Sequence, residues 1–216
     1  MKRHMPVWQE SILLVVTALI MAVIVKGLFV QAFYIPSQSM EPALHVNDKI
    51  LVQKVSYWFG SPHRGDVVVF DDPGGWLGPG DATVARNPVQ RGLELIGLFP
   101  TGGHLIKRVI GVGGDRVVCC DARGRLTVNG TSLDEPYLLS EPGPTGDQKF
   151  DVKVPDGHLW VMGDNRGNSA DSRVHTGDPG GGFVDADEVV GKAWVRVWPM
   201  NRLAVIRDPN AFSAIP

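Results

Sequence analysis

Ser39 is the residue whose type and position most suggest chemistry in this sequence. It lies in a proline-containing segment, Ile35–Pro42, shortly after an apolar run that extends from Ile12 to Val25. A hydroxyl held in such a loop next to a membrane suggests a nucleophile that acts on something arriving through the membrane. A serine hydroxyl is a weak nucleophile until a base removes its proton. The interpretation therefore depends on finding that base.

Histidine is the usual partner of a nucleophilic serine, and the chain has six. None of them lies in a Gly-x-Ser-x-Gly elbow or a His-Glu-x-x-His zinc motif. Each is better explained as a solvated or structurally satisfied side chain. The six are His4, His45, His63, His104, His158 and His175.

Lys107 is the other candidate base. It lies inside the apolar segment Leu105–Ile110, where no acidic residue is adjacent in sequence. Burial disfavours an ammonium group and can lower a lysine pKa by as much as ~3–5 units. A neutral amine there could deprotonate Ser39 near neutral pH. The alternative is an edge-strand lysine that points into water and opposes aggregation.

Four segments together resemble the conserved boxes of bacterial type I signal peptidases, in the same order and behind an N-terminal apolar stretch. The resemblance covers the chain from about residue 10 to about residue 200. An insert around Trp76 and the pair Cys119-Cys120 make the chain most similar to actinobacterial members. The segments are Ile35–Pro42 (nucleophile box), Arg64–Phe70 (second box), Lys107–Asp115 (base box) and Gly163–Arg173 (closing box).

The resemblance implies a role for each matching residue. Ser39 matches the acylating nucleophile and Lys107 its general base. Ser169 matches a hydroxyl that orients the lysine, and Ser37 a donor to the oxyanion that acts with the Ser39 N–H. The closing-box pair Asp171 and Arg173 matches a structural ion pair. Positions lining a shallow pocket for a small substrate residue, or simply packing in the core, are Ile35, Pro36, Met40 and Ile106.

The implied activity is removal of signal peptides from secretory preproteins at small-x-small sites, with no cofactor and no metal. The implied partners are these preproteins, the lipid bilayer and the protein-export translocon. Two positions depart from the family pattern: Gln38 stands where glycine is common, and Gly167 where an acidic residue is common. Neither change removes a catalytic group.

The N-terminal pattern predicts a single membrane anchor. A spanning helix needs about 20 apolar residues, and only two strongly polar residues, Lys26 and Gln31, interrupt residues 12–34. A cleaved signal peptide is the alternative, but the run is long and no Ala-x-Ala site follows it. The basic residues at positions 2 and 3 predict a cytoplasmic N-terminus. The expected division is a cytoplasmic end (1–10), a transmembrane anchor (11–34) and an extracytoplasmic catalytic domain (35–216).

The rest of the chain is mainly β in pattern. Short runs rich in Val and Ile are separated by Gly, Pro, Asp and Asn, which predicts a barrel-like domain of strands and turns. Asn129-Gly130 predicts a hairpin turn. We also expect a flap-like insert (73–103), helical over 88–99, and a β-rich subdomain (117–156). The predicted strands are 49–55, 66–70, 105–112, 116–119, 125–128, 159–162 and 189–197.

Composition and cysteine spacing narrow the choice of function. The formal net charge of -2 gives no basic field for nucleic acid. Cys119 and Cys120 are adjacent, a spacing that favours neither a disulfide nor a metal site.

Two other functions use related features. A self-cleaving regulator with Ser–Lys chemistry should lack the anchor, and a membrane-tethered binding module should lack Ser39 or Lys107; this chain has all three.

Overall fold

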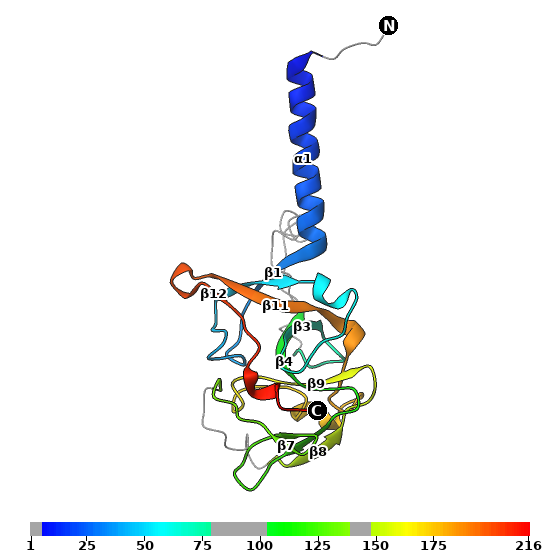
Figure 1. Cartoon of the computed structure of the whole chain (residues 1–216), viewed down its shortest axis with the longest axis vertical. Coiled ribbons are helices and arrows are strands. Elements are labelled where there is room, and N and C mark those ends of the chain that lie inside the picture. Colours follow the sequence, from blue (N-terminus) through cyan, green and yellow to red (C-terminus); the bar gives the residue numbers. More distant parts are fainter. Residues whose placement is uncertain (1–5, 79–102, 139–147) are drawn as a thin grey trace.

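The protein is seen here as a computed structural model that describes residues 6–78, 103–138 and 148–216. One long helix stands above a body made of two β-sheets (Figure 1). The prediction of a mainly β chain with an N-terminal apolar helix is confirmed. The predicted helix over 88–99 and most of the insert at 73–103 lie outside the described residues.

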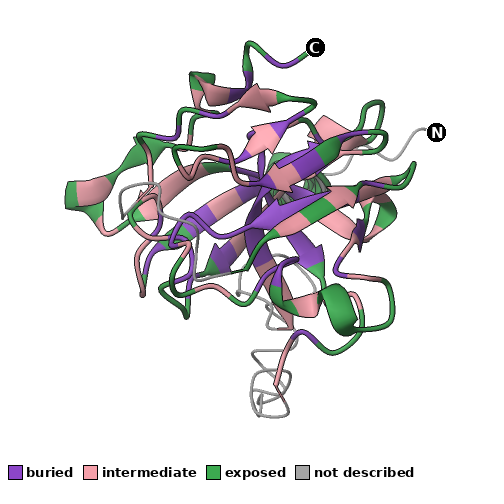
Figure 2. Cartoon of the chain, turned by 90° about the horizontal axis from the view of Figure 1, so that it is seen from below, coloured by how far each residue is buried: buried purple, intermediate pink, exposed green. Residues whose placement is uncertain are grey.

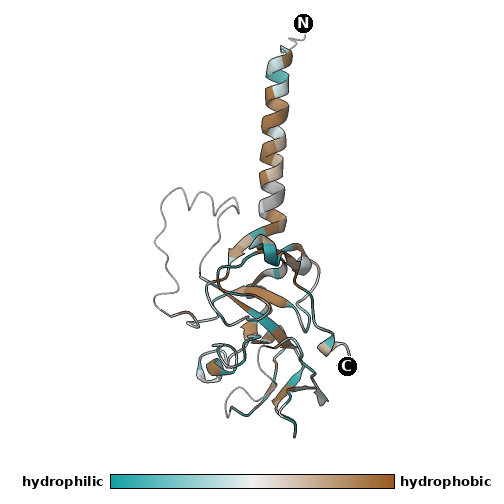
Figure 3. Ribbon diagram, turned by 90° about the vertical axis from the view of Figure 1, so that its left-hand side faces the viewer, coloured by the Kyte–Doolittle hydropathy of each residue, from teal (hydrophilic) through white to brown (hydrophobic). Residues whose placement is uncertain are grey.

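Helix α1 (Val7–Phe29) is mostly apolar, with polar residues, Glu10 among them, near its N-terminal end (Figure 3). Its 23 residues correspond to a length of about 35 Å at 1.5 Å per residue, slightly more than the hydrocarbon core of a bilayer. No residue of its most apolar window is buried against the rest of the protein. Length and composition therefore suit a membrane-spanning helix.

The predicted anchor, 11–34, ends too late. Residues Val30–Tyr34 form strand β1, which pairs antiparallel with β2 (Lys49–Gln53) over five positions from Val30↔Gln53 to Tyr34↔Lys49. Apolar composition alone could not separate the two elements, because a buried strand and a buried helix share it. The chain thus passes directly from the helix into the sheet that leads to the Ser39 loop.

The larger sheet has eight strands in the order β1-β2-β11-β3-β4-β9-β10, with β12 paired to β11. All of its neighbouring strands are antiparallel. Among the described strands β1 and β10 end the sheet, so the barrel-like sheet is not closed. The remaining strands are β3 (Val67–Asp71), β4 (His104–Val112), β9 (His158–Met162), β10 (Val184–Asp185), β11 (Val189–Trp198) and β12 (Ala204–Val205).

The smaller sheet corresponds to the predicted β-rich subdomain. Its order is β7-β6-β5-β8, with bounds β5 (Arg116–Cys119), β6 (Thr127–Val128), β7 (Thr131–Ser132) and β8 (Phe150–Lys153). Asn129 and Gly130 have φ of 51° and 82°, which is the backbone a tight hairpin requires. The predicted hairpin turn is therefore confirmed.

Five short 3-10 helices complete the described structure. Four of them lie between consecutive strands, and the fifth follows β12. They are η1 (Val55–Tyr57), η2 (Val174–Gly177), η3 (Ala186–Glu188), η4 (Met200–Arg202) and η5 (Asn210–Phe212).

The two sheets share one of the protein's hydrophobic cores. Val117 and Leu133, from the smaller-sheet region, pack in the same buried cluster as Trp160 and Met162 of β9. Buried positions run through the centre of the strands (Figure 2). Since β9 ends at Met162, this shared core fixes the start of the closing box at Gly163.

The structure corrects the expectation for the cysteines. Cys119 and Cys120 form a disulfide with each other, across a cis peptide bond. Cys119 is buried in the core shared by the two sheets. The disulfide thus lies at the C-terminal end of β5, whose last residue is Cys119.

Asp115 joins the second box to the smaller sheet. Its carboxylate accepts two hydrogen bonds from Arg64, at 2.7 and 2.6 Å, one from the Val112 N–H and one from the Asn129 side chain. Burial by itself raises the pKa of Asp115, but these donors lower it below its usual value. The folded protein therefore holds this group as a carboxylate.

We expect Asp115→Ala to lower the free energy of unfolding by about 2–3 kcal/mol, because the mostly buried Arg64 guanidinium loses its carboxylate partner. The matched control is Asp151→Ala, since Asp151 forms a similar two-bond pair with Arg116 but on the exposed surface. Thermal unfolding of the full chain in detergent measures both. Equal melting temperatures for the two variants would contradict the assignment.

Candidate active site

The Ser39 loop follows directly from β1. The Ile35 N–H donates to the Asp48 carbonyl at 3.0 Å, and the Asn47 N–H donates back to the Ile35 carbonyl at 2.9 Å, so the base of the loop is closed by the backbone. The Ser39 carbonyl accepts from the Asn165 N–H at 3.0 Å. These contacts hold a buried serine, 7% exposed, between the sheet edge and the closing box.

Lys107 lies in the middle of β4, opposite Val68 of β3. Its side chain is only 3% exposed, and its Nζ lies 2.9 Å from Ser39 Oγ, close enough for a hydrogen bond. The structure thus brings together two residues that are 68 positions apart in the sequence. The alternative of a solvent-facing edge lysine is wrong, because β4 lies between β3 and β9.

The pKa of Lys107 falls from 10.5 to about 8. Burial is the main cause, since an ammonium loses its hydration there. The Asp171 carboxylate opposes the fall, Arg173 adds to it, and Asp164 opposes it again. A substantial neutral fraction therefore exists at mildly alkaline pH, which is the form that can accept a proton.

Charged side chains of the closing box lie near Ser39 and Lys107, and each of them is paired with an opposite charge. Arg173 donates two hydrogen bonds to Asp171, at 2.8 and 2.7 Å, and both side chains are buried. Asp171 also accepts from the Gly163 N–H at 3.0 Å. Arg108, next to the lysine on β4, makes a similar buried pair with Asp164 at 2.7 and 2.6 Å.

The two other serines occupy different positions relative to the pair. Ser37 Oγ lies 3.2 Å from Ser39 Oγ and on the exposed side of the loop. Ser169 Oγ is buried and makes no hydrogen bond to any described residue. The contact from Ser169 to Lys107 that the family resemblance implies is therefore not formed in this structure, where the lysine amine contacts Ser39 instead.

The expected pocket-lining residues divide into two groups. Ile35, Met40 and Ile106 pack together in one buried core cluster beneath the loop, whereas Pro36 is exposed. The first three therefore support the loop from below, and Pro36 faces outward beside Ser37.

None of the five described histidines forms a hydrogen bond or ion pair with Ser39 or Lys107. Four of them approach carboxylates instead: His45 with Glu41, His63 with Asp66, His104 with Asp71 and His175 with Asp178. His158 contacts the Asp156 carbonyl.

Sequence reasoning missed two residues that hold the site together. Asn165 donates from its backbone to Ser39 and from its side chain to the Gln38 carbonyl at 3.1 Å. Gly163 lies so close to the site that a Cβ would come within 2.4 Å of the Ser39 carbonyl oxygen and 2.3 Å of Ser169 Oγ. Their place in the closing box was the available signal, but only the folded structure shows what they touch.

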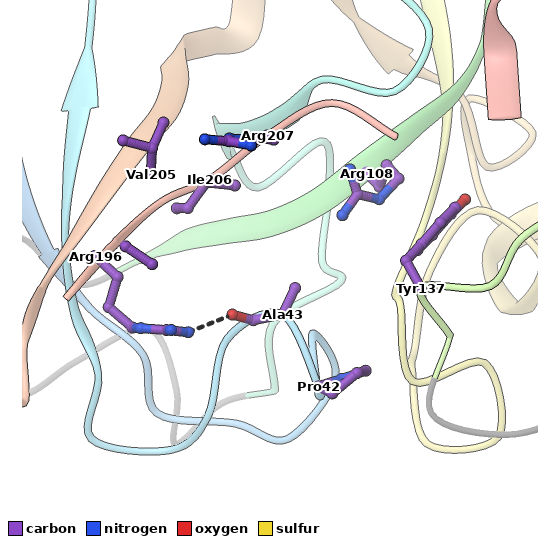
Figure 4. Close-up of a pocket in the computed structure, with 9 residues that line it drawn as sticks. Pro42, Ala43, Arg108, Tyr137, Arg196, Val205, Ile206 and Arg207 are labelled. Atoms are coloured by element: carbon purple, nitrogen blue, oxygen red, sulfur yellow. Dashed lines mark hydrogen bonds between the residues drawn. The ribbon is translucent and has the colours of Figure 1, made fainter. Parts of the chain in front are cut away.

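A pocket of about 300 Å³ lies beside the segment that follows Ser39. Pro42 and Ala43 form one side, and Arg108 and Tyr137 form one end (Figure 4). Arg196 closes the opposite end by donating to the Ala43 carbonyl at 2.7 Å. The Arg196 side chain thus braces the segment that follows Ser39.

A buried serine and lysine in hydrogen-bond contact, on a mainly β body with an apolar N-terminal helix, form a constellation typical of a serine hydrolase that uses an amine base. Residues 8–198 match the family model described as signal peptidase, peptidase S26. The chain belongs to this family and is a signal peptidase enzyme.

The relatives agree with that assignment. The chain is 42% identical to signal peptidase I of Mycobacterium tuberculosis H37Rv, over 94% of this chain and 76% of the relative. It is 40% identical to a probable signal peptidase I of Mycobacterium leprae, over 97% and 82%. These two relatives confirm the predicted similarity to actinobacterial type I signal peptidases. A signal peptidase I structure from Enterococcus faecalis is 28% identical, covers 62% of this chain and 97% of its own, and has a TM-score of 0.39.

We expect Gly163→Ala to reduce cleavage by about 10²-fold, because the added methyl group displaces the nucleophile loop and misplacement on the ångström scale has that effect on rate. Gly167→Ala is the matched control, since a Cβ there meets nothing within 4 Å. The measurement is kcat/KM on a preprotein. Comparable rates for the two variants would show that the close approach at Gly163 has no catalytic consequence.

We also expect Lys107→Met to stabilise the folded protein at pH 7. The folded-state pKa of about 8 lies below the unfolded value of 10.5, so the unfolded wild type binds more protons, and wild-type stability increases as pH rises through this interval. The gain from the substitution is about 1–3 kcal/mol at pH 7 and shrinks as the pH rises towards the unfolded-state pKa. Melting temperatures at neutral pH and at about two units higher measure it; a difference that does not depend on pH would contradict the buried-amine assignment.

Proposed function

We propose that this chain is a membrane-anchored endopeptidase that cleaves signal peptides from preproteins, with Ser39 as nucleophile and Lys107 as general base. The observation that carries the proposal is the 2.9 Å contact between Ser39 Oγ and the Lys107 amine. Both groups are buried, and burial lowers the pKa of the amine to about 8. A base with a pKa near the working pH is the most effective proton acceptor.

The proposed reaction has two halves. Ser39 Oγ attacks the scissile carbonyl while the Lys107 amine takes the hydroxyl proton, and the resulting ammonium gives that proton to the leaving amine as the peptide bond breaks. A water molecule then loses a proton to the same amine and attacks the serine ester, which releases the second product and restores the hydroxyl. The Ser39 N–H and the Ser37 hydroxyl stabilise the oxyanion in each half.

The proposed substrate is an extended segment with small residues at the first and third positions before the cleaved bond. Among the described strands β1 ends the large sheet, and it leads straight into the Ser39 loop, which suits recognition by an added strand. Ile35, Pro36, Met40 and Ile106 lie at or beneath that path. Their packing supports a shallow pocket that admits only a small side chain.

In the proposed topology α1 crosses the membrane once, with the N-terminal end in the cytoplasm and the catalytic body on the outer side. Lys2 and Arg3 support that orientation, because basic residues near a span favour the cytoplasmic side. The helix leads directly into β1, which keeps the nucleophile loop close to the bilayer surface where a preprotein emerges. Preproteins and lipid are the proposed partners, together with the export translocon.

The test is cleavage of a purified preprotein in detergent by the wild-type chain, Ser39→Ala and Lys107→Ala. We expect the wild type to release the mature product and both variants to lose at least about 10³-fold in kcat, as members of a unit that acts together do. Substantial activity in Lys107→Ala would show that another residue is the base.

The pH dependence of the wild-type reaction tests the role of the amine separately. The rate should increase with pH through an apparent pKa near 8 and then level off, because only the neutral amine accepts the proton. A rate that rises instead through about pH 6–7 would point to a histidine.

A further inference from the structure

Glu135 is a buried carboxylate for which the proposed reaction has no use. It follows β7 of the smaller sheet and is 5% exposed. Its two oxygens accept from the two terminal nitrogens of Arg166, at 2.9 and 2.5 Å. Burying a charged pair is costly, so a pair that joins the smaller sheet to the closing box calls for an explanation.

Arg166 links this carboxylate to both ends of the closing box. Its Nε donates to the Gly163 carbonyl at 3.1 Å, and its own carbonyl accepts from Arg173 at 2.9 Å. Because the planar Arg166 guanidinium donates to both Glu135 oxygens and to the Gly163 carbonyl, these bonds hold it in a single orientation. Fixing that orientation therefore fixes the path of the chain from Gly163 to the Asp171–Arg173 pair.

Tyr137 makes a second connection from the same segment. Its hydroxyl donates to Glu135 Oε1 at 2.6 Å, and its ring lies 4.7 Å from the guanidinium carbon of Arg108. Figure 4 shows Tyr137 and Arg108 side by side at the end of the pocket. Arg108 is adjacent to Lys107 on β4, so the segment 135–137 contacts the flanks of both the base strand and the closing box.

The protonation states of Tyr137 and Arg166 follow from their burial and from the charged groups beside them. Burial, and then the Glu135 charge, raise the pKa of Tyr137 well above its usual value. Burial by itself lowers the pKa of Arg166, but its neighbours, Glu135 first and then Tyr137 and Asp164, together raise it above its usual value. The cluster therefore holds a neutral phenol and a charged guanidinium, the forms that its hydrogen bonds require.

We propose that Glu135 is a positioning residue for the nucleophile: through Arg166 it holds the closing box, whose Asn165 holds the Ser39 backbone. This inference rests on the proposed function, and it adds the segment 135–137, which follows β7, to the groups that hold the site. The path is Glu135 to Arg166, Arg166 to Gly163, and Asn165 N–H to the Ser39 carbonyl at 3.0 Å. The alternative is a pair that only stabilises the fold.

The surface pair Arg116–Asp151 is a matched control. It has the same two-bond geometry, at 2.7 and 2.5 Å, and it also belongs to the smaller sheet. Its side chains are 66% and 49% exposed, and neither of the two hydrogen bonds reaches the closing box. Asp151→Asn should therefore leave cleavage unchanged.

The experiment compares full-length wild type, Glu135→Gln, the double variant Glu135→Met/Arg166→Met and Asp151→Asn, each at a temperature well below its own melting temperature. We expect kcat of Glu135→Gln to fall at least about tenfold with KM within about twofold, because the effect is on the nucleophile and not on substrate binding. The double variant removes both charges and should recover most of the melting temperature but not kcat. Recovery of kcat together with stability would show that the pair is only structural.

Hydrogen exchange separates failure of this inference from failure of the proposed function. In Glu135→Gln we expect faster exchange in peptides covering residues 36–44 and 163–169 than in Asp151→Asn, whether or not the wild type cleaves a preprotein. If the wild type cleaves nothing, the proposed function fails while the exchange result still tests the positioning. Unchanged exchange in those peptides, or unchanged kcat in a folded Glu135→Gln, would overturn the inference.

Discussion

The burial of one lysine amine is the constraint on which the rest of this structure depends. Lys107 is almost completely enclosed, and its amine forms a hydrogen bond to the hydroxyl of Ser39. An ammonium in that position has lost most of its hydration, which lowers its pKa to about 8. The same burial that weakens the folded state makes the amine available as a base.

Much of the surrounding structure can be understood as keeping that amine both buried and aligned. Two ion pairs with matched charges, Asp171–Arg173 and Asp164–Arg108, lie around it, so the site contains charge without a large net field of either sign. Asp171 and Arg173 pull the lysine pKa in opposite directions. Desolvation therefore remains the dominant influence, and the position of the closing box decides how well the amine meets Ser39.

The sequence predicted seven of the twelve described strands but missed β1, β7, β8, β10 and β12. It singled out Ser39 and Lys107 as a pair, but not the contacts that surround them. Short runs rich in Val, with Ile in β4, predicted β3, β4 and β11, and Asn129-Gly130 predicted the turn between β6 and β7. The end of α1 was misplaced because β1 is as apolar as the helix it follows. Gly163, Asn165 and Glu135 could not be found from residue type, since their importance comes from approach across distant segments. The Cys119–Cys120 bond was missed because adjacent cysteines seldom pair.

The most direct test of the central claim is the protonation state of Lys107 itself. Selectively labelled lysine side chains of the full chain, titrated by NMR, should show one amine with a pKa near 8, and that signal should be absent from the Lys107→Met variant. If every lysine in the wild type titrates near its ordinary value of about 10.4, the amine is not desolvated in the folded protein. A neutral lysine could not then be the group that activates Ser39 near neutral pH.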